Sequence, residues 1–570
     1  NLKLKGQVGA DLSNTRESNY SPSYTTTGLE YNGVASVGSM RTNVWQAEFT
    51  ANYDNTFNLL HHLTLLGGYT AQRTDRSGYA TTVRNFANDA TGYDNLSAAS
   101  DLYSSTSEAY ISTLQSWLGR VNYSYDSRYN LSLTLRADGS SRFAQKHKWG
   151  LFPSVGLSWN IDKEKFFRPN EYVSRLQLRL SAGIVGNQEI GDYQFAANVS
   201  PTSVPHIVGG QETIAYYILN QANPDLKWER TASYNAGISS EFFNSRLTVT
   251  LDAYYKKTTD LLLQVPIEHT TGYETALRNV GSVTNKGVEL AISGVLIHNK
   301  NLNWVANFNI AHNKNLVTSL GNATSIIPEF DGATLGYISP LIITVGQPLG
   351  TFYGYKFKGI VQKDTDISAL PAQSISPLEP GNPIYEDVNG DNVVDTQDQT
   401  ILGNSQPKFT YGFNTSFSWK NLDVFITLAG SYGNKLYNGL ATRLTKGSTY
   451  YNALASVADR WTEDNPSNLI QKASNELTVV AESRYVEDAS YLRVKNIQLG
   501  YTFPIKKITS DAKIRLFMSL QNFFTITGYS GYDPEAARNG MDEHSALYQG
   551  VDMATYPVAK TVQFGLQLTL

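Results

Sequence analysis

Apolar and polar side chains alternate along most of this chain with a period of two. In residues 246–257, one face carries Leu247, Val249, Leu251, Ala253 and Tyr255. The same alternation recurs in 131–138 and 561–570. Since successive side chains of a β-strand point to opposite sides of a sheet, this pattern predicts strands with one apolar and one polar face. We count about sixteen such segments.

The connections between these segments are of two kinds. Short polar turns occur at 125–130, 242–246 and 297–303. The long connections are 80–107, 188–225, 319–406, 438–484 and 528–555. Short turns on one side and long loops on the other are typical of an up-and-down barrel in a bacterial outer membrane. Many segments exceed the roughly 9–11 residues that cross a bilayer, so we expect strands that project beyond it.

The predicted fold is therefore all-β: a transmembrane antiparallel β-barrel with long extracellular loops and short periplasmic turns. A soluble sandwich, solenoid or propeller also alternates, but the chain shows no fixed repeat of roughly 20–50 residues. The polar face is rich in Thr, Ser, Gln and Asn, as a water-filled lumen requires. Aromatic residues near the predicted strand ends would form the membrane-interface girdles. These are Trp45, Tyr53, Trp117, Tyr123, Trp159, Trp419, Tyr432 and Tyr501.

Composition excludes several classes of protein. Of the 570 residues, 17% are charged and the net charge is −4, which excludes a nucleic-acid binder with a basic face. The absence of cysteine excludes a disulfide scaffold, a thiolate metal site and a cysteine nucleophile. No apolar run reaches the roughly 18 residues of a transmembrane helix. The chain begins within a strand-like pattern, without a signal peptide, so we expect it to be a piece of a longer protein.

One acidic segment stands out in the long connection 319–406. Oxygen-bearing side chains occupy positions 1, 3, 5, 9 and 12 of a twelve-residue loop: Asp387, Asn389, Asp391, Asp395 and Asp398. Val393 at position 7 would contribute its backbone carbonyl, as in an EF-hand-type calcium loop. Asn392 replaces the usual glycine, which is tolerable because Asn visits the left-handed region readily. Asp replaces the usual terminal Glu, as in the calcium loops of dockerin modules, which this segment resembles.

Two interpretations of this segment are open: a solvated Asn/Asp/Gly turn, or a structural Ca²⁺ site that staples the long loop. The correct spacing favours the Ca²⁺ site, and no adjacent nucleophile or base suggests metal-assisted hydrolysis. Elsewhere, Leu454, Val457, Ala458 and Trp461 recur at helical spacing and predict a short helix within 449–467 that packs a loop onto its neighbours.

Several longer stretches resemble one family. They are 136–161, 176–195, 223–238, 277–292, 345–362, 402–426, 485–504 and 516–535, among them "NPDLKWERTASYNAGI" and "YVEDASYLRVKNIQLGYTFP". In this order they resemble the C-terminal barrel of a SusC-type (SusC/RagA-like) TonB-dependent transporter of the outer membrane of Bacteroidota. The resemblance covers essentially the whole chain and rests on many independent motifs.

The resemblance implies a barrel of about 22 strands with a plug domain in its lumen. Residues 1–570 would then be part of one barrel domain, and the plug and TonB-binding segment would lie outside this chain. The implied function is TonB-dependent uptake of oligosaccharides or oligopeptides, with a SusD-type surface lipoprotein as a lid and a dimer of transporter–lipoprotein pairs. The other implied partner is outer-membrane lipid, and no nucleic acid is expected. The last strand, ending in Leu570, would be the signal for barrel insertion.

Other functions are also compatible with a barrel of alternating strands. A passive porin-like channel of about sixteen strands and a siderophore-type TonB-dependent receptor are the alternatives. The chain has neither a GxSxG nor an HExxH signature, so we do not expect an enzyme. Arg136, Asp138 and Asp252 are expected to give the lumenal wall general polarity. Loop aromatics that could stack on sugar rings, but that more commonly pack loops, are Tyr193, Tyr216, Tyr217, Tyr450, Tyr451, Tyr529 and Tyr532.

Overall fold

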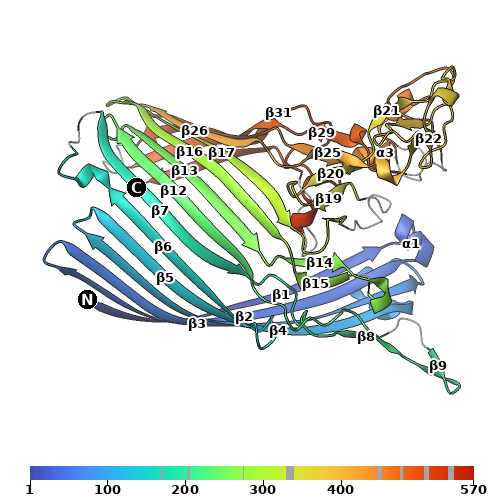
Figure 1. The fold of residues 1–570 in the computed structure, drawn as a ribbon, viewed down its shortest axis with the longest axis horizontal. Helices are drawn as coiled ribbons and strands as arrows, with labels where there is room; N and C mark the ends of the chain where they lie inside the picture. Colours follow the sequence, from blue (N-terminus) through green and yellow to red (C-terminus); the bar gives the residue numbers. More distant parts are fainter. Residues whose placement is uncertain are drawn as a thin grey trace. The chain divides into compact units, whose positions relative to one another are not determined.

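The computed structural model describes residues 1–167, 170, 172–201, 206–273, 275–328, 339–445, 452–474, 479–505, 512–536 and 545–569. Within these residues the main feature is a sixteen-stranded sheet with the order β1-β2-β3-β4-β5-β6-β7-β12-β13-β16-β17-β26-β27-β30-β31-β33 (Figure 1). Long strands that follow one another in the chain are neighbours in this sheet. Pairing is antiparallel from β1 to β5 and from β13 to β33. The predicted all-β meander and its number of strands are confirmed.

The sixteen strands are β1 (Leu2–Ser21), β2 (Val34–Phe57), β3 (His61–Phe86), β4 (Ala99–Tyr125), β5 (Tyr129–Ser140), β6 (Trp149–Asn160), β7 (Val173–Asn187), β12 (Glu229–Phe242), β13 (Leu247–Thr259), β16 (Ser282–His298), β17 (Leu302–Ser319), β26 (Phe409–Trp419), β27 (Leu422–Tyr432), β30 (Tyr491–Pro504), β31 (Lys513–Thr527) and β33 (Thr561–Thr569). The short strands are β8 (Val199–Pro201), β9 (His206–Val208), β10 (Gln211–Thr213), β11 (Tyr216–Ile218), β14 (Leu262–Pro266), β15 (Thr275–Asn279), β18 (Ser325–Ile326), β19 (Leu341–Thr344), β20 (Thr351–Gly354), β21 (Phe357–Ile360), β22 (Ala372–Gln373), β23 (Pro383–Tyr385), β24 (Val393–Val394), β25 (Thr400–Asn404), β28 (Lys435–Asn438), β29 (Val486–Asp488) and β32 (Val551–Asp552).

The chain divides into two compact units. Unit 1 contains Asn1–Leu157, Ser181–Ala232 and Asp260–Asn279, and unit 2 contains Ser158–Leu180, Ser233–Thr259 and Val280–Leu570. Strands β1 to β5 lie in unit 1. Strands β13, β16, β17 and the later long strands lie in unit 2, together with the acidic loop.

The strands of unit 1 have one apolar face that is exposed. Phe49 on β2 pairs with Tyr69 on β3, which in turn pairs with Trp117 on β4. Phe49 and Trp117 are 58% and 59% exposed, which would be unfavourable in water. The neighbouring row, on the opposite face, carries Glu48 and Ser116. This arrangement is that of a barrel wall, with lipid on one side and a polar lumen on the other.

Exposed aromatic side chains also occur at most of the predicted girdle positions. Those with at least two-fifths of their surface exposed are Trp45, Trp117, Trp419, Tyr432 and Tyr501. Tyr123 instead accepts or donates a hydrogen bond with His61 at 2.8 Å, and Trp159 donates one to Glu164 at 3.0 Å.

Strands β2, β3 and β4 are far longer than a membrane is thick. They contain 24, 26 and 27 residues. At about 3.3 Å per residue they span roughly 80–90 Å, against about 30 Å of hydrocarbon. The expected projection beyond the bilayer is confirmed, but the predicted loop 80–107 is wrong, because only 87–98 separate β3 from β4. Outside the bilayer neither face has to be apolar, so pairs such as Thr81–Ser105 continue the sheet without alternation.

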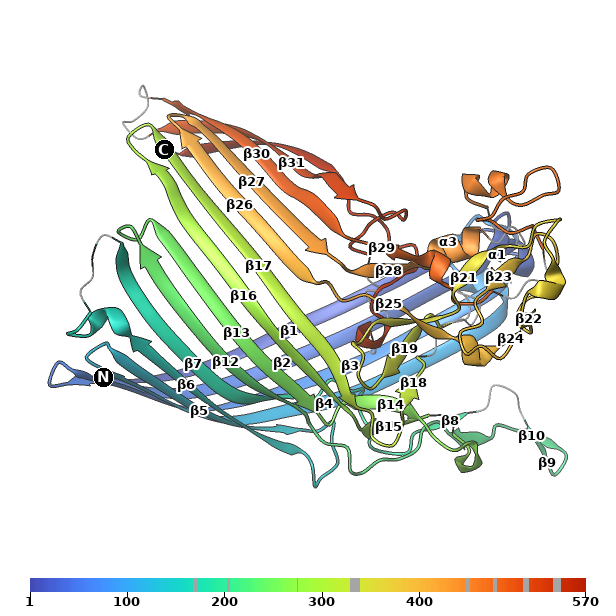
Figure 2. The same cartoon turned by 45° about the horizontal axis from the view of Figure 1, so that its top comes forward.

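The long loops of unit 2 fold into small sheets (Figure 2). These sheets have an apolar core of their own. Strands β18, β19, β20 and β25 form one sheet, and β28, β29 and β32 form another. Phe352 of β20 and Tyr437 of β28 are buried in the same apolar cluster, together with Tyr485 and Val551. Segments that are far apart in the numbering, such as 352 and 551, are therefore held together by burial of apolar surface.

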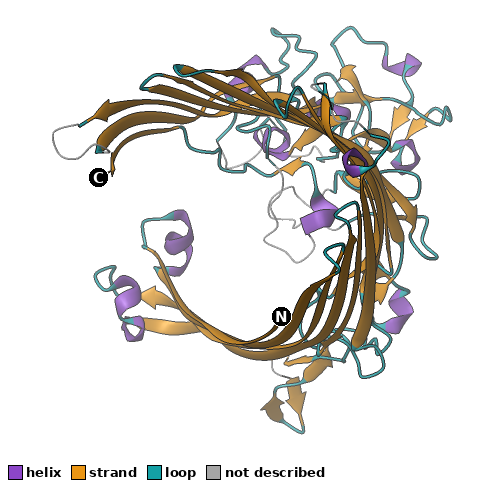
Figure 3. Cartoon of the chain, turned by 90° about the vertical axis from the view of Figure 1, so that its left-hand side faces the viewer, coloured by secondary structure: helices purple, strands orange, loops and turns teal. Residues whose placement is uncertain are grey.

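Helical segments are short and lie between the strands (Figure 3). Among the described residues, the α-helices are α1 (Thr26–Tyr31) and α3 (Gly439–Leu444). The helix predicted within 449–467 is wrong over its described residues, where only Ala455–Asp459 form a 3₁₀-helix. Trp461 instead donates its indole N–H to Gln362 at 3.0 Å, so tertiary contacts override the helical spacing. No helix in the described part of the chain is long and apolar enough to span a membrane.

Candidate functional site

The acidic loop lies in unit 2, between β23 and β25. Gly390 and Asn392 have positive φ values of 78° and 66° and make its tight turns. The expectation that Asn392 adopts the left-handed conformation is confirmed. Val393 and Val394 then form β24, which pairs in parallel with β22. A neighbouring segment of the same long loop therefore holds the end of the acidic loop in place.

Backbone hydrogen bonds to two aspartates stabilise the turns. Asp387 Oδ1 accepts one from the Gly390 N–H at 2.7 Å. Asp398 Oδ1 and Oδ2 accept from the N–H groups of Val388 at 2.7 Å and Asp395 at 2.8 Å. Burial alone would raise the pKa of the Asp398 carboxyl, but these backbone N–H groups hold it below its ordinary value. Asp398 is thus a buried, ionised carboxylate.

The six predicted ligands lie in one loop but differ in exposure. Asp398 is buried, Asp387 and Asp395 are half-buried, and the remaining three, Asn389, Asp391 and Val393, are exposed. Among the described residues, no three His, Asp or Glu side chains are grouped closely enough to hold a metal ion. Asp391 instead accepts a hydrogen bond from the Asn389 amide at 3.1 Å. No described Lys or Arg forms an ion pair with the four aspartates of the loop.

The candidate loop aromatics fall into different environments. Tyr529 is 6% exposed, and its hydroxyl donates to Asp552 at 2.7 Å, so it packs the loop. The Tyr193 hydroxyl donates to the Ile111 carbonyl at 3.2 Å. Tyr193 is nevertheless exposed, as are Tyr216, Tyr217 and Tyr532. Tyr450 and Tyr451 lie outside the described residues.

An ion cluster centred on the buried pair Arg493–Asp533 anchors the last long loop, and no sequence pattern indicated it. Arg493, near the start of β30, is 2% exposed. It donates to Asp533 at 2.6 Å and pairs with Glu535, which also accepts from Lys495 at 2.7 Å. Burial alone would raise the pKa of Asp533, but Arg493 and backbone N–H groups hold it below its ordinary value. The charges of Asp533 and Glu535 are thus balanced by Arg493 and Lys495. These ion pairs hold residues 528–536 against β30.

A second buried pair joins two of the long loops. Glu482 is 3% exposed and pairs with Arg484, whose guanidinium lies 4.2 Å from the centre of the Phe357 ring. Burial raises the pKa of Glu482 above its ordinary value, although Arg484 favours the ionised form. The backbone N–H of Tyr355 donates to the Ala481 carbonyl at 2.8 Å. These contacts hold residues 353–360 against 479–485.

The charged residues predicted for the polar wall pair with neighbouring groups. Arg136 Nε lies 2.7 Å from Asp138 Oδ1. The Arg136 guanidinium also donates a hydrogen bond to the Ser116 hydroxyl at 2.9 Å. Asp252 pairs with Arg179 at 3.0 Å. The expectation that these side chains give the wall general polarity agrees with this pairing.

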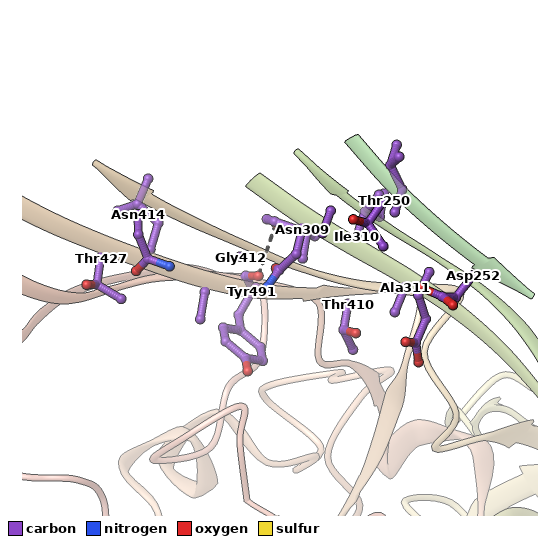
Figure 4. A pocket seen from close by; sticks show the side chains of 17 residues that line it. Thr250, Asp252, Asn309, Ile310, Ala311, Thr410, Gly412, Asn414, Thr427 and Tyr491 are labelled. Carbon is purple, nitrogen blue, oxygen red and sulfur yellow. Dashed lines mark hydrogen bonds between the residues drawn. The ribbon is translucent and has the colours of Figure 1, made fainter. Parts of the chain in front are cut away.

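The polar face of unit 2 also contains a recess of about 660 Å³ (Figure 4). Its lining residues come from β13, β16, β17, β26 and β27, with Tyr491 from β30. The polar residues of the lining are Thr250, Asp252, Glu289, Asn309, Thr410, Tyr411, Asn414, Thr427 and Tyr491. Sequence reasoning named only Asp252, because the recess depends on the register of six strands.

Comparison with known proteins agrees with this architecture. A family model described as "TonB dependent receptor-like, beta-barrel" matches residues 1–523. The chain is 32% identical over 571 aligned residues to TonB-dependent receptor P3 of Formosa agariphila, covering 100% of this chain and 56% of that protein. It is 31% identical over 471 residues to TonB-dependent receptor SusC of Bacteroides thetaiotaomicron, covering 80% of this chain and 43% of that protein. The chain thus spans about half the length of these curated relatives.

Solved structures give the same result. The chain superposes on a structure of the RagAB peptide transporter with a TM-score of 0.80 and 26% identity, covering 100% of this chain and 60% of that one. For the "open-open" state of the RagAB peptide importer, the TM-score is 0.81 and the identity 25%, with coverage of 100% and 59%. The TonB-dependent receptors are transporters and not enzymes. The chain belongs to the TonB-dependent receptor family, as part of an outer-membrane β-barrel of the SusC/RagA type.

Proposed function

We propose that this chain forms wall and loops of a TonB-dependent outer-membrane importer that takes up oligosaccharides or oligopeptides. The observation that carries the proposal is the sixteen-stranded sheet with its exposed apolar face and its polar face, in a chain that resembles SusC and RagAB over most or all of its length. A polar lumen suits ligands rich in hydroxyl and amide groups. The RagAB structures are of a peptide importer, which supports peptides as one candidate cargo.

The proposed partners follow from the same relatives. A SusD-type surface lipoprotein would close the mouth of the barrel, and TonB would drive uptake through a plug and a TonB-binding segment outside this chain. Loop segments held in fixed positions by buried ion pairs, such as 528–536 and 479–485, offer ordered surface on which a lid can rest. The assembly would be a dimer of transporter–lipoprotein pairs.

Uptake by cells tests the proposal. A strain that lacks the gene for the whole protein should lose uptake of at least one labelled oligosaccharide or oligopeptide pool, and re-expression should restore it. A protonophore should abolish the same uptake in the wild type, because TonB-dependent transport needs the proton-motive force. Uptake that persists after the proton-motive force collapses would contradict the proposal and favour a passive channel.

We propose in addition that the acidic loop binds Ca²⁺ in a structural role. Its ligands would be the side chains of Asp387, Asn389, Asp391, Asp395 and Asp398 and the backbone carbonyl of Val393. Ligand spacing, the left-handed Asn392 and the lack of a cationic partner among the described residues support this assignment. Because Asp391 is bound to the Asn389 amide, these exposed side chains would have to turn inward. The ion would then offset the repulsion between carboxylates.

A further inference from the structure

The recess on the polar face of unit 2 results from small side chains in the middle of paired strands. One row across the sheet reads Thr250, Ala291, Asn309, Gly412 and Ala429. Alanine and glycine leave the floor low, whereas the longer side chains of the adjacent rows form a rim. At about 660 Å³, the recess lies within the range of roughly 300–1,000 Å³ that small-ligand sites occupy.

Two acidic side chains face each other at the rim. Asp252 on β13 and Glu289 on β16 are direct cross-strand partners, an arrangement that is destabilising for like charges. Arg179 offsets the charge of Asp252, at a distance of 3.0 Å. Glu289 is exposed, and within the described residues its carboxylate has no hydrogen bond or ion pair. The recess therefore carries one uncompensated negative charge.

The rest of the lining suits a polar ligand that carries a positive charge. Tyr491 and Thr410 project from the same side of the sheet (Figure 4), and Asn414 and Thr427 add amide and hydroxyl groups. Neutral sugars would bind such hydroxyl and amide groups, but they carry no positive charge to pair with the Glu289 carboxylate. Anionic glycans would be repelled by it. An ammonium or guanidinium group would gain a charge-assisted hydrogen bond.

We propose that this recess is a transit subsite for a basic side chain or the amino terminus of an oligopeptide, with Glu289 as its specificity-determining residue. The inference rests on the proposed import function and narrows the cargo to peptides with a cationic group. Glu289 acts as the fixed anion, and the amide and hydroxyl groups around the floor accept and donate to the peptide backbone.

Binding to the whole transporter tests this. The full-length protein, purified with its lipoprotein partner, would be titrated with a lysine-containing oligopeptide and with the same peptide acetylated on lysine and on its amino terminus. Glu289→Gln should weaken binding of the cationic peptide about tenfold and leave the acetylated peptide unchanged. Glu48→Gln, on the polar face of β2 outside the recess, is the matched control and should change neither affinity.

The outcomes separate this inference from the import proposal. Equal effects of Glu289→Gln on both peptides would overturn the subsite. So would a wild type that binds neutral oligosaccharides but neither peptide, although import would then stand. If the wild type binds no oligomer of either kind, the import proposal falls as well. A lowered melting temperature of Glu289→Gln without a change in peptide preference would mean that another part of the protein fills the recess, which overturns the subsite.

Discussion

Arg179 on β7 and Asp252 on β13 form an ion pair at 3.0 Å across the strand that lies between them. The intervening strand, β12, carries Gly237 at the crossing. A Cβ atom there would lie 2.1 Å from Asp252 Oδ1 and 2.9 Å from Arg179 Nη2. The same arrangement recurs where Arg515 pairs with Asp423 across Gly500. Because glycine has no side chain, the side chains of the two flanking strands can meet over the strand between them.

Replacing Gly237 should therefore weaken the wall. Gly237→Val displaces the Asp252 carboxylate and separates the ion pair, and we expect a loss of roughly 1–3 kcal/mol from overpacking. Gly294→Val, in β16, is the control, because a Cβ there would meet nothing closer than 3.7 Å. Thermal unfolding in detergent, followed by tryptophan fluorescence, measures both. Equal melting temperatures for the two variants would contradict the crossing as a stabilising contact.

Arg493 should be essential to the order of the last long loop. Arg493→Ala leaves Asp533 and Glu535 without their shared buried cation, and breaking a buried pair costs about 3–5 kcal/mol. Hydrogen exchange measured by mass spectrometry should become faster in 528–536. Arg175→Ala is the control, because that arginine belongs to a more exposed ion pair with Glu241. Unchanged protection of 528–536 in Arg493→Ala would contradict the anchoring role.

The same cluster should make the loop sensitive to acid. For both Asp533 and Glu535, burial would raise the pKa, but the partners named above hold it below the ordinary value. Their stabilisation is therefore fully present above the unfolded pKa values of about 4 and is lost as the pH falls through the lower folded values. Hydrogen exchange in 528–536 should accelerate below about pH 4 in the wild type. Arg493→Ala should lack that acid-dependent step. An identical pH profile in both proteins would contradict the role of the Arg493 ion pairs in the acid sensitivity of 528–536.

Calcium binding can be titrated directly. With the protein stripped by a chelator, isothermal titration should show one binding event that disappears when Asp387 and Asp391 are both changed to Ala. Asp364→Ala removes an exposed acid of the same long loop and should leave that event intact. If wild type and the double variant titrate alike, the loop is an ordinary polar turn.

Local sequence patterns predicted those parts of the fold that are set by residues close together in the chain. Alternation such as that of Leu247 to Tyr255 identified strands and their number, and the ligand-like spacing located the turn at Asn392. Pairs such as Arg493–Asp533 are forty positions apart and meet only because the loop that contains Asp533 folds back onto β30, so no local pattern reveals them. The extension of β3 to Phe86 was missed because apolar and polar residues do not alternate regularly over its last residues, where Val83 and Phe86 join a separate apolar cluster. Trp461 lies at a helical spacing in the sequence, but in the structure its indole N–H donates a hydrogen bond to Gln362 of another loop.

The import account is tested most directly by mass spectrometry of the complex extracted gently from its native membrane, with identification of everything that co-purifies. We expect a longer form of this chain, a SusD-type lipoprotein and a bound oligopeptide or oligosaccharide. A chain of these 570 residues alone, without a lipoprotein and without a bound oligomer, would contradict it and favour the passive channel.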